Sequence, residues 1–265
     1  MKAMIIFAIR TLRAMFTKRN RYVRISPFKQ GKIYFYDKIE RKFFGIFVRE
    51  STDSRVADQV FTHNDYDLSF LKRYDELMGK YKSIQSQNKV PLIIDCGANI
   101  GLSARHFATT FPQSMIIAIE PEKNNFSVMK KNCSGLKNVE LLNKAVGNVD
   151  GYVNIKDSDV DNNAFRTSRN ENGEGDIEVI SINSILSIHN EVVPFIVKID
   201  IEGFEEDLFS NQTEWVEKFT LLIIETHDWM LPKQANSHNF LKVISKQDRD
   251  FIHYKGENIF SISNN

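Results

Sequence analysis

One stretch of the chain decides its fold: Ile93-Ile94-Asp95-Cys96-Gly97-Ala98-Asn99-Ile100-Gly101. An apolar run ends here in an acid and a glycine turn, and a segment with helical character follows over residues 102–110. A short apolar run of this kind predicts a buried parallel strand whose carboxyl end faces a ligand. Glycine has no Cβ, so the backbone of the turn can approach that ligand closely.

A second strand is predicted at residues 115–119, and it ends in Glu120, twenty-five residues after Asp95. An acid at the tip of a second strand, near this spacing, typically binds the ribose hydroxyls of a nucleoside cofactor. The dinucleotide fingerprint would need glycines at positions 97, 99 and 102, but Asn99 and Leu102 stand there. NAD is therefore disfavoured, because its pyrophosphate needs the close approach that the second glycine allows. S-adenosylmethionine has no phosphates, and the turn and the acid suffice for it.

The predicted cofactor site combines the glycine turn, the second acid and the end of a third strand. Asp95 would bind the methionine ammonium directly or through water, and Glu120 would bind the ribose. A third strand at residues 138–142 leads to Ala145, whose backbone groups are expected beside the adenine. Both acids could instead stabilise the positive end of the following helix. The candidate cofactor-binding residues are Asp95, Gly97, Ala98, Asn99, Gly101, Glu120 and Ala145.

Two later apolar runs, residues 195–199 and 221–224, also end in polar clusters. Lys198, Asp200 and Glu202 alternate, so we expect them to share one face of an extended strand. A charged residue on a buried parallel strand needs a reason, and near the carboxyl end the reason is usually a ligand. A structural ion pair between Lys198 and Asp200 is the alternative.

The residues after these runs suit methyl transfer to a hydroxyl, which needs in-line approach and removal of a proton. The candidate catalytic residues are Asp200, Glu202, Glu225 and His227. A divalent metal held by Asp200 and Glu225 could acidify the hydroxyl instead, and the sequence leaves both mechanisms open. Neither an Asn-Pro-Pro-Tyr nor an Asp-Pro-Pro-Tyr signature occurs, which argues against methylation of a base or amide nitrogen.

Taken in order, these motifs resemble the FkbM-type methyltransferase family over residues 49–228. The matching residues are Ile94 to Gly101, Glu120-Pro121, Lys198 to Gly203 with Glu205, Glu225-Thr226-His227, and upstream Arg49, Asp53, Val60-Phe61 and Tyr66. The resemblance implies S-adenosylmethionine-dependent methylation of a hydroxyl of a sugar, a surface glycan or a related natural product. The alternatives are a nucleic-acid or protein methyltransferase and a non-catalytic cofactor-binding module.

Strands and helices alternate from residue 91 onward, which predicts an α/β fold with a doubly wound, Rossmann-like methyltransferase sheet. The sheet is expected to be mostly parallel and to end in an antiparallel C-terminal hairpin at residues 251–254 and 259–262. An added hairpin at residues 152–156 and 177–182 would bracket a loop, which is expected to be mobile or to cover the substrate. We place the methyltransferase domain at residues 88–265, after a small α+β N-terminal extension at residues 1–87.

The N-terminal extension is strongly basic. Residues 1–49 contain thirteen Lys and Arg against Asp37 and Glu40, a formal charge of +11, so the rest of the chain carries −10 for a total of +1. Residues 1–16 are amphipathic at helical spacing and too short for a membrane span of ~20 residues. This helix is expected to dock on the protein's own core, to contact a membrane peripherally through residues 1–24, or to bind a polyanionic substrate or nucleic acid.

The remaining predictions concern the extension's other elements and the compartment. A hairpin is expected at residues 33–36 and 43–48, with helices at residues 54–61 and 67–81. Two cysteines are too few for a disulfide framework, so a reduced, cytoplasmic setting is expected, with membrane association at the cytoplasmic face left open. The acceptor is expected to be a small molecule or a glycan, and a nucleic-acid partner is disfavoured.

Overall fold

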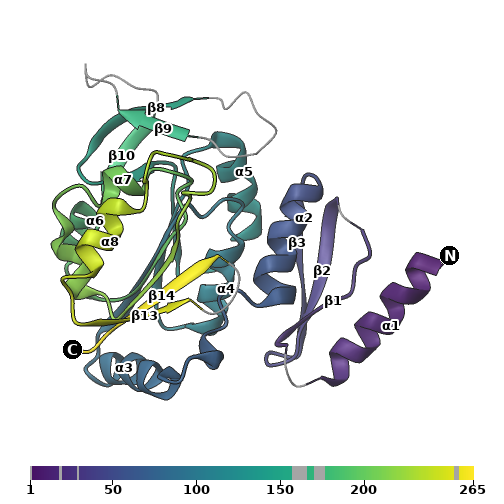
Figure 1. The fold of residues 1–265 in the computed structure, drawn as a ribbon. Helices are drawn as coiled ribbons and strands as arrows, with labels where there is room; N and C mark the ends of the chain where they lie inside the picture. Colours follow the sequence, from purple (N-terminus) through teal and green to yellow (C-terminus); the bar gives the residue numbers. More distant parts are fainter. Residues whose placement is uncertain (1, 18–19, 29, 157–165, 170–176, 254–256) are drawn as a thin grey trace.

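A seven-stranded sheet forms the centre of the protein (Figure 1). The structure, a computed structural model, describes all residues except 1, 18–19, 29, 157–165, 170–176 and 254–256. The strand order is β13-β14-β12-β11-β4-β5-β6. In chain order these strands are β4 (Val90–Cys96), β5 (Met115–Ile119), β6 (Val139–Leu142), β11 (Val192–Ile199), β12 (Leu221–Glu225), β13 (Arg249–His253) and β14 (Asn258–Ser263). Five strands are parallel and β13 and β14 form an antiparallel hairpin, so the predicted fold class is confirmed.

Both faces of the sheet are covered by helices, which explains the uninterrupted apolar runs in the parallel strands. Ile93 and Ile196 point to one face and pack against α3, α4 and α5, whereas Ile94 and Val197 point to the other and pack against α6, α7, η3 and α8. The helices are α3 (Tyr74–Ser86), α4 (Leu102–Thr110), α5 (Lys123–Asn132), α6 (Ile182–Ile188), α7 (Glu205–Leu208), η3 (Thr213–Lys218) and α8 (His238–Ile244).

The strand order reverses between β4 and β11. From β4 the chain builds outward through β5 to β6, and then returns to the other side of β4 to form β11 and β12. In open α/β sheets ligands bind outside the carboxyl ends of the strands at such a switch point. Gly97 and Asp200 meet there, because they follow directly on β4 and β11, and the Asp200 N–H donates to the Cys96 carbonyl at 3.1 Å.

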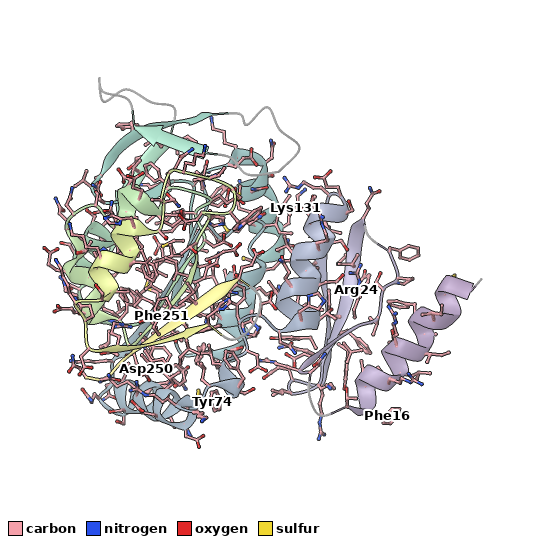
Figure 2. All side chains as sticks on the ribbon, in the orientation of Figure 1. Phe16, Arg24, Tyr74, Lys131, Asp250 and Phe251 are labelled. Carbon is pink, nitrogen blue, oxygen red and sulfur yellow. The ribbon has the colours of Figure 1, made fainter. Side chains whose placement is uncertain are left out.

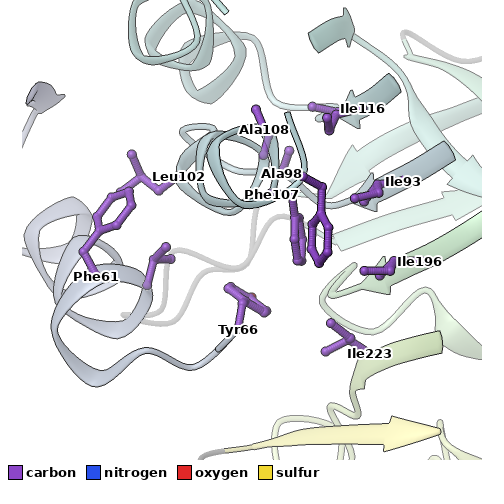
Figure 3. Close-up of a cluster of buried hydrophobic side chains, with 14 of the residues drawn as sticks. Phe61, Tyr66, Ile93, Ala98, Leu102, Phe107, Ala108, Ile116, Ile196 and Ile223 are labelled. Atoms are coloured by element: carbon purple, nitrogen blue, oxygen red, sulfur yellow. The ribbon is translucent and has the colours of Figure 1, made fainter. Parts of the chain in front are cut away.

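The N-terminal extension is a three-stranded antiparallel sheet with helices. Its elements are α1 (Lys2–Phe16), β1 (Tyr22–Arg24), β2 (Gly31–Asp37), β3 (Lys42–Val48), α2 (Ser51–Asp58), the π-helical η1 (Gln59–His63) and η2 (Leu68–Phe70). The predicted hairpin is present as β2 and β3, with β1 added at its edge. Phe61 of η1 belongs to the same buried cluster as Phe107 of α4 and Ile93 of β4 (Figure 3). The core is thus continuous across residue 88, and the domain boundary there stays a prediction.

A smaller four-stranded sheet has the order β7-β10-β8-β9. Its strands are β7 (Ala145–Gly147), β8 (Gly151–Lys156), β9 (Arg166–Arg169) and β10 (Ile177–Ser181). The predicted hairpin appears as β8 antiparallel to β10, but β7 and β9 were not predicted. The strand predicted to reach residue 182 stops at Ser181, whose Oγ accepts from the Ser184 N–H and caps the unpredicted α6. Most of the predicted loop 157–176 lies outside the described residues.

Some other predicted boundaries were wrong. The strand predicted to carry Lys198, Asp200 and Glu202 on one face ends at Ile199. Asp200 and Glu202 lie in the turn that follows, and Glu202 has a left-handed backbone with φ 52°. The alternation of a strand therefore does not decide whether the Asp200 and Glu202 side chains lie on the same side of the chain. The helix predicted at residues 67–81 is split into η2 and α3.

The first helix, α1, lies beside the three-stranded sheet on the side away from the seven-stranded sheet (Figure 1). Among the large apolar side chains of α1 that the structure describes, Phe7 is half-buried and the others are exposed. The exposed ones are Met4, Ile6, Ile9, Leu12, Met15 and Phe16. Among the described residues, no helix has the length and apolar character needed to span a membrane.

Candidate active site

A buried lysine holds the glycine turn in place. Lys198 Nζ donates to the Gly97 carbonyl at 2.7 Å and lies 3.2 Å from Asp95 Oδ1, an ion pair without hydrogen-bond geometry. The other Asp95 oxygen accepts from Ser103 Oγ at 2.6 Å. Asp95 is fully buried and lines neither of the two pockets described below. Its predicted contact with the cofactor ammonium therefore stays a prediction, and its observed role is to anchor Lys198 and α4.

A narrow pocket of about 50 Å³ opens between the ends of β4, β5 and β11. Four of the predicted cofactor residues line it, namely Gly97, Asn99, Glu120 and Ala145. Ala98 lines the larger neighbouring cavity, and Gly101 lines neither. A Cβ at Gly101 would come within 2.7 Å of the Met129 side chain, so this glycine allows α4 to pack closely on α5.

Glu120 is a buried carboxylate with a polar cradle. Its Oε2 accepts from the Asn99 N–H at 2.8 Å, and its Oε1 accepts from the Glu122 N–H at 3.0 Å. Burial raises the pKa of Glu120 to about 7, although these hydrogen bonds oppose the shift. Oε1 also accepts from Asn125 Nδ2 at 3.3 Å, so the lone pair that remains for a hydroxyl donor from the narrow pocket is on Oε2.

The narrow pocket adjoins a larger cavity of about 1250 Å³. Gly97, Asn99, Asp200 and Glu202 line both. The larger cavity adds further polar residues of the two strand-end clusters, namely Lys198, Glu225 and His227. The structure thus brings the predicted catalytic residues and most of the predicted cofactor residues to one connected space. Their individual roles stay predictions.

His227 stands at the centre of the catalytic candidates. Its Nε2 lies 3.5 Å from Asp200 Oδ1 and 3.6 Å from Glu225 Oε1. Asp200 Oδ2 lies 3.4 Å from Lys198 Nζ, so the ion pair considered as an alternative from sequence is present. This pair does not remove Asp200 from the site, because its carboxylate also lines both pockets.

Glu205 is a site residue to which the sequence analysis assigned no role. It is completely buried at the start of α7, and its Oε1 lies 2.7 Å from His227 Nδ1. Asn236 donates to its other oxygen. A carboxylate on one ring nitrogen fixes the orientation of the imidazole and turns the second nitrogen toward the cavity. Its place three residues after Glu202, in the quoted motif, was the available signal, but the motif did not reveal its partner.

The ionisable side chains of this cluster have pKa values that burial and neighbouring charges shift in different directions. Burial alone would raise the pKa of Asp200, but Lys198 and His227 outweigh it and lower that pKa to about 2. Burial alone would lower the pKa of His227, but Asp200 and Glu205 raise it to about 11. Burial and the Asp200 charge raise the pKa of Glu225 to about 9 and that of Glu202 to about 8. At neutral pH, Asp200 is therefore ionised and His227 is protonated.

The same residues fit a divalent cation. One ligand atom each from Asp200, Glu225 and His227 lie within 4.8 Å of one another. Two carboxylate oxygens and an imidazole nitrogen suit Mn²⁺, Fe²⁺ or Zn²⁺, and a histidine whose other nitrogen is bound by a buried carboxylate is the usual form of a metal ligand. The pair of carboxylates also suits an organic cation such as a sulfonium.

The N-terminal extension forms one wall of the larger cavity. Arg49 pairs with Asp53 at 2.9 Å and donates to Asn125 Oδ1 at 2.7 Å, which ties the start of α2 to α5. Tyr66 is buried beside the catalytic cluster, and its ring packs on Phe107. Trp229 lines the same cavity and remains 61% exposed, so a flat apolar surface faces the space in front of His227.

Comparisons with known proteins find similarity to methyltransferases. The chain is 24% identical over 142 residues to the hexuronic acid methyltransferase AglP of Haloferax volcanii, a match that covers 53% of this chain and 58% of the relative. The chain thus spans little more than half the length of that relative. An O-methyltransferase from Bacillus cereus, solved with S-adenosylhomocysteine, is 11% identical with a TM-score of 0.38, over 72% of this chain and 81% of that one.

A structure from Klebsiella pneumoniae assigned as an O-methyltransferase gives similar values, with 11% identity and a TM-score of 0.42 over 72% of this chain and 81% of that one. Structural likeness at this level carries no argument about function. The model of the methyltransferase FkbM domain matches residues 95–252, which is more than half of the chain and includes Asp95, Glu120, Asp200 and His227. The chain therefore belongs to the FkbM methyltransferase family.

Proposed function

We propose that the protein is an S-adenosylmethionine-dependent O-methyltransferase that acts on a hydroxyl of a sugar or surface glycan. The observation that carries the proposal is the junction of the two pockets. Glu120 lines the narrow pocket at the sheet's switch point, and Asp200, Glu225 and His227 line the cavity that joins it. The narrow pocket would bind adenosine with its ribose on Glu120, so the sulfonium methyl would point into the larger cavity.

The acceptor hydroxyl would then be methylated within the larger cavity. Its oxygen would attack in line the methyl carbon that a bound S-adenosylmethionine supplies, with the thioether of S-adenosylhomocysteine as the leaving group. The hydroxyl proton passes to a base, whose ideal pKa lies near the working pH. Glu225, with a pKa of about 9, would take the proton in its ionised form, so turnover through this base should rise as pH approaches 9. Asp200, with a pKa of about 2, is too weak a base for this step. Asp200 would orient the acceptor and stabilise the positive charge of the donor.

A bound divalent cation would supply an alternative by acidifying the acceptor hydroxyl. Asp200, Glu225 and His227 would hold it, and Glu205 would orient His227. A sugar acceptor is supported by two observations. Trp229 offers an exposed aromatic surface in the cavity, against which the C–H face of a sugar ring can pack. The AglP relative is named for methylation of a hexuronic acid.

Methyl transfer from labelled donor to fractionated host extracts tests the proposal. We expect the label in the glycan or lipid-linked saccharide fraction, and as an O-methyl sugar after hydrolysis. Label in protein or nucleic acid would overturn the acceptor class. Binding of S-adenosylhomocysteine without transfer to any fraction would indicate a non-catalytic cofactor-binding module. Tight binding of NADH with no response to S-adenosylhomocysteine would refute the cofactor.

The pH dependence of cofactor binding should follow Glu120. The folded-state pKa of Glu120 is raised from 4.5 to about 7, so the folded protein favours the protonated form of this side chain. The contribution of Glu120 to folding stability is therefore fully present below about pH 4.5 and is lost as pH rises through about 7. Ribose hydroxyls donate to the ionised form, so affinity for S-adenosylhomocysteine should rise about tenfold between about pH 6 and 8. Calorimetric titration at both pH values measures this change.

Two variants identify the group responsible. In Glu120→Gln, affinity for S-adenosylhomocysteine should be weaker, and its tenfold increase with pH should vanish. Glu140→Gln removes a carboxylate that lines neither of the two pockets and should behave as the unmodified protein. A rise of equal size in Glu120→Gln would assign the titration to another group.

A further inference from the structure

Exposed apolar side chains are concentrated at one end of the protein. Of the seventeen large hydrophobic side chains that are exposed among the described residues, eleven lie between Met4 and Phe47. The same part of the chain, residues 1–49, carries a formal charge of +11. None of these eleven side chains lines either pocket of the active site at the carboxyl ends of the central strands.

The half-buried side of α1 carries one large apolar residue, Phe7, together with the polar Thr11 and the small Ala14. Thr11 Oγ1 donates to the Arg24 carbonyl at 3.2 Å, and Lys38 Nζ donates to the Ala14 and Thr17 carbonyls at 3.2 and 2.6 Å. A helix docked by its apolar face would show the reverse arrangement. Phe16, at the end of α1, is 86% exposed and lies on the outer side of the molecule (Figure 2).

Basic and aromatic side chains continue this surface. Arg10 and Arg13 of α1 are exposed. On the neighbouring hairpin, Phe43 and Phe47 of β3 are exposed, and the Lys32 ammonium lies 5.5 Å from the centre of the Phe47 ring. Long basic side chains beside aromatic rings are typical of segments that lie at the interface between lipid headgroups and acyl chains.

We propose that α1 binds an anionic lipid surface, with its apolar side chains among the acyl chains and Arg10 and Arg13 at the headgroups. Charge decides between the possible partners. A symmetric contact with a second copy of the chain would bring two strongly basic segments together, which repel. A nucleic acid would match the charge but would leave six large apolar side chains of α1 in water. An anionic bilayer matches both the charge and the apolar surface, and 15 residues are too few to cross it.

Co-sedimentation of the full chain with lipid vesicles tests the proposal. Vesicles of phosphatidylcholine with phosphatidylglycerol should pellet the protein, whereas phosphatidylcholine alone should pellet much less. The combined variant Arg10→Gln, Arg13→Gln should lower the partition coefficient about tenfold at low salt. The combined variant Ile9→Gln, Leu12→Gln, Phe16→Gln should lose binding, because the apolar contribution to insertion is removed.

A matched control places the same chemical change elsewhere. Ile188 and Leu241 are exposed on α6 and α8, so Ile188→Gln, Leu241→Gln should bind vesicles as the unmodified protein does. Circular dichroism and thermal melting of every variant check that the fold is intact. Pelleting of the unmodified protein that is equal with both vesicle types would overturn the proposal. So would pelleting that the combined variant Ile9→Gln, Leu12→Gln, Phe16→Gln leaves unchanged. The proposal would also be overturned if the unmodified protein is a dimer in size-exclusion chromatography and the variant Ile9→Gln, Leu12→Gln, Phe16→Gln is a monomer. That result would assign the surface to self-association.

Discussion

Replacing Gly97 with alanine is expected to abolish binding of S-adenosylhomocysteine and to lower the melting temperature by several degrees. Gly97 has φ +76°, and a Cβ there would lie 1.8 Å from the Asp200 carbonyl oxygen. Such a distance requires the turns after β4 and β11 to move apart. That movement would break the hydrogen bond from Lys198 to the Gly97 carbonyl and open the narrow pocket. Calorimetric titration and differential scanning calorimetry measure both effects.

The control for this variant is Gly135→Ala. Gly135 has φ +82°, but a Cβ there would have no atom within 4 Å. The Gly135→Ala variant therefore has the energetic cost of an alanine in a left-handed conformation, ~1–2 kcal/mol, without a steric clash. The Gly135 variant should be somewhat less stable and should bind S-adenosylhomocysteine normally. If the two variants lose equal stability and both bind, the contact between Gly97 and Asp200 has no role in forming the cofactor site.

Replacing Asp200 with asparagine is expected to reduce turnover by ~10²-fold or more, the usual scale of acid–base catalysis, because the charge that orients the acceptor beside the base Glu225 is removed. Affinity for S-adenosylhomocysteine should change only a few-fold, since Glu120 and the glycine turn are untouched. Asparagine keeps the shape but removes the charge that raises the pKa values of His227 and Glu225. The pH profile of turnover should therefore shift to lower pH. Steady-state kinetics across pH and calorimetry with S-adenosylhomocysteine measure these quantities.

Two results would contradict this assignment of Asp200. Normal turnover with a much lower melting temperature would show that Asp200 only pairs with Lys198. An equal loss of turnover in Glu206→Gln, which alters an exposed carboxylate on α7, would show that any loss of negative charge near the site suffices. A chelator separates the two mechanisms. Loss of activity in EDTA that Mg²⁺ or Mn²⁺ restores supports a metal held by Asp200, Glu225 and His227, and activity that EDTA leaves unchanged supports a base.

Features that depend on near neighbours in the chain were predictable from sequence. The apolar run before Asp95, the glycines that follow it and the alternation of strands and helices predicted the doubly wound sheet with its antiparallel hairpin. Because carboxyl ends of parallel strands meet at one edge, acids that follow several strands could be expected to share a site. The sequence therefore determined the fold class and the family, and it placed Glu120, Asp200 and His227 near one another.

Features that depend on register and on side-chain direction across long sequence separations were decided only by the tertiary structure. Lys198 reaches the Gly97 carbonyl 101 residues away, and Glu205 holds His227 from the start of α7, 22 residues earlier. Strand periodicity ends at Ile199, so the direction of the Asp200 side chain toward His227 does not follow from the sequence. The amphipathic pattern of α1 likewise identified the helix but not the direction of its apolar side chains. That direction depends on which residues of α1 contact the rest of the chain, since packing against the protein and insertion into a membrane require the same periodicity.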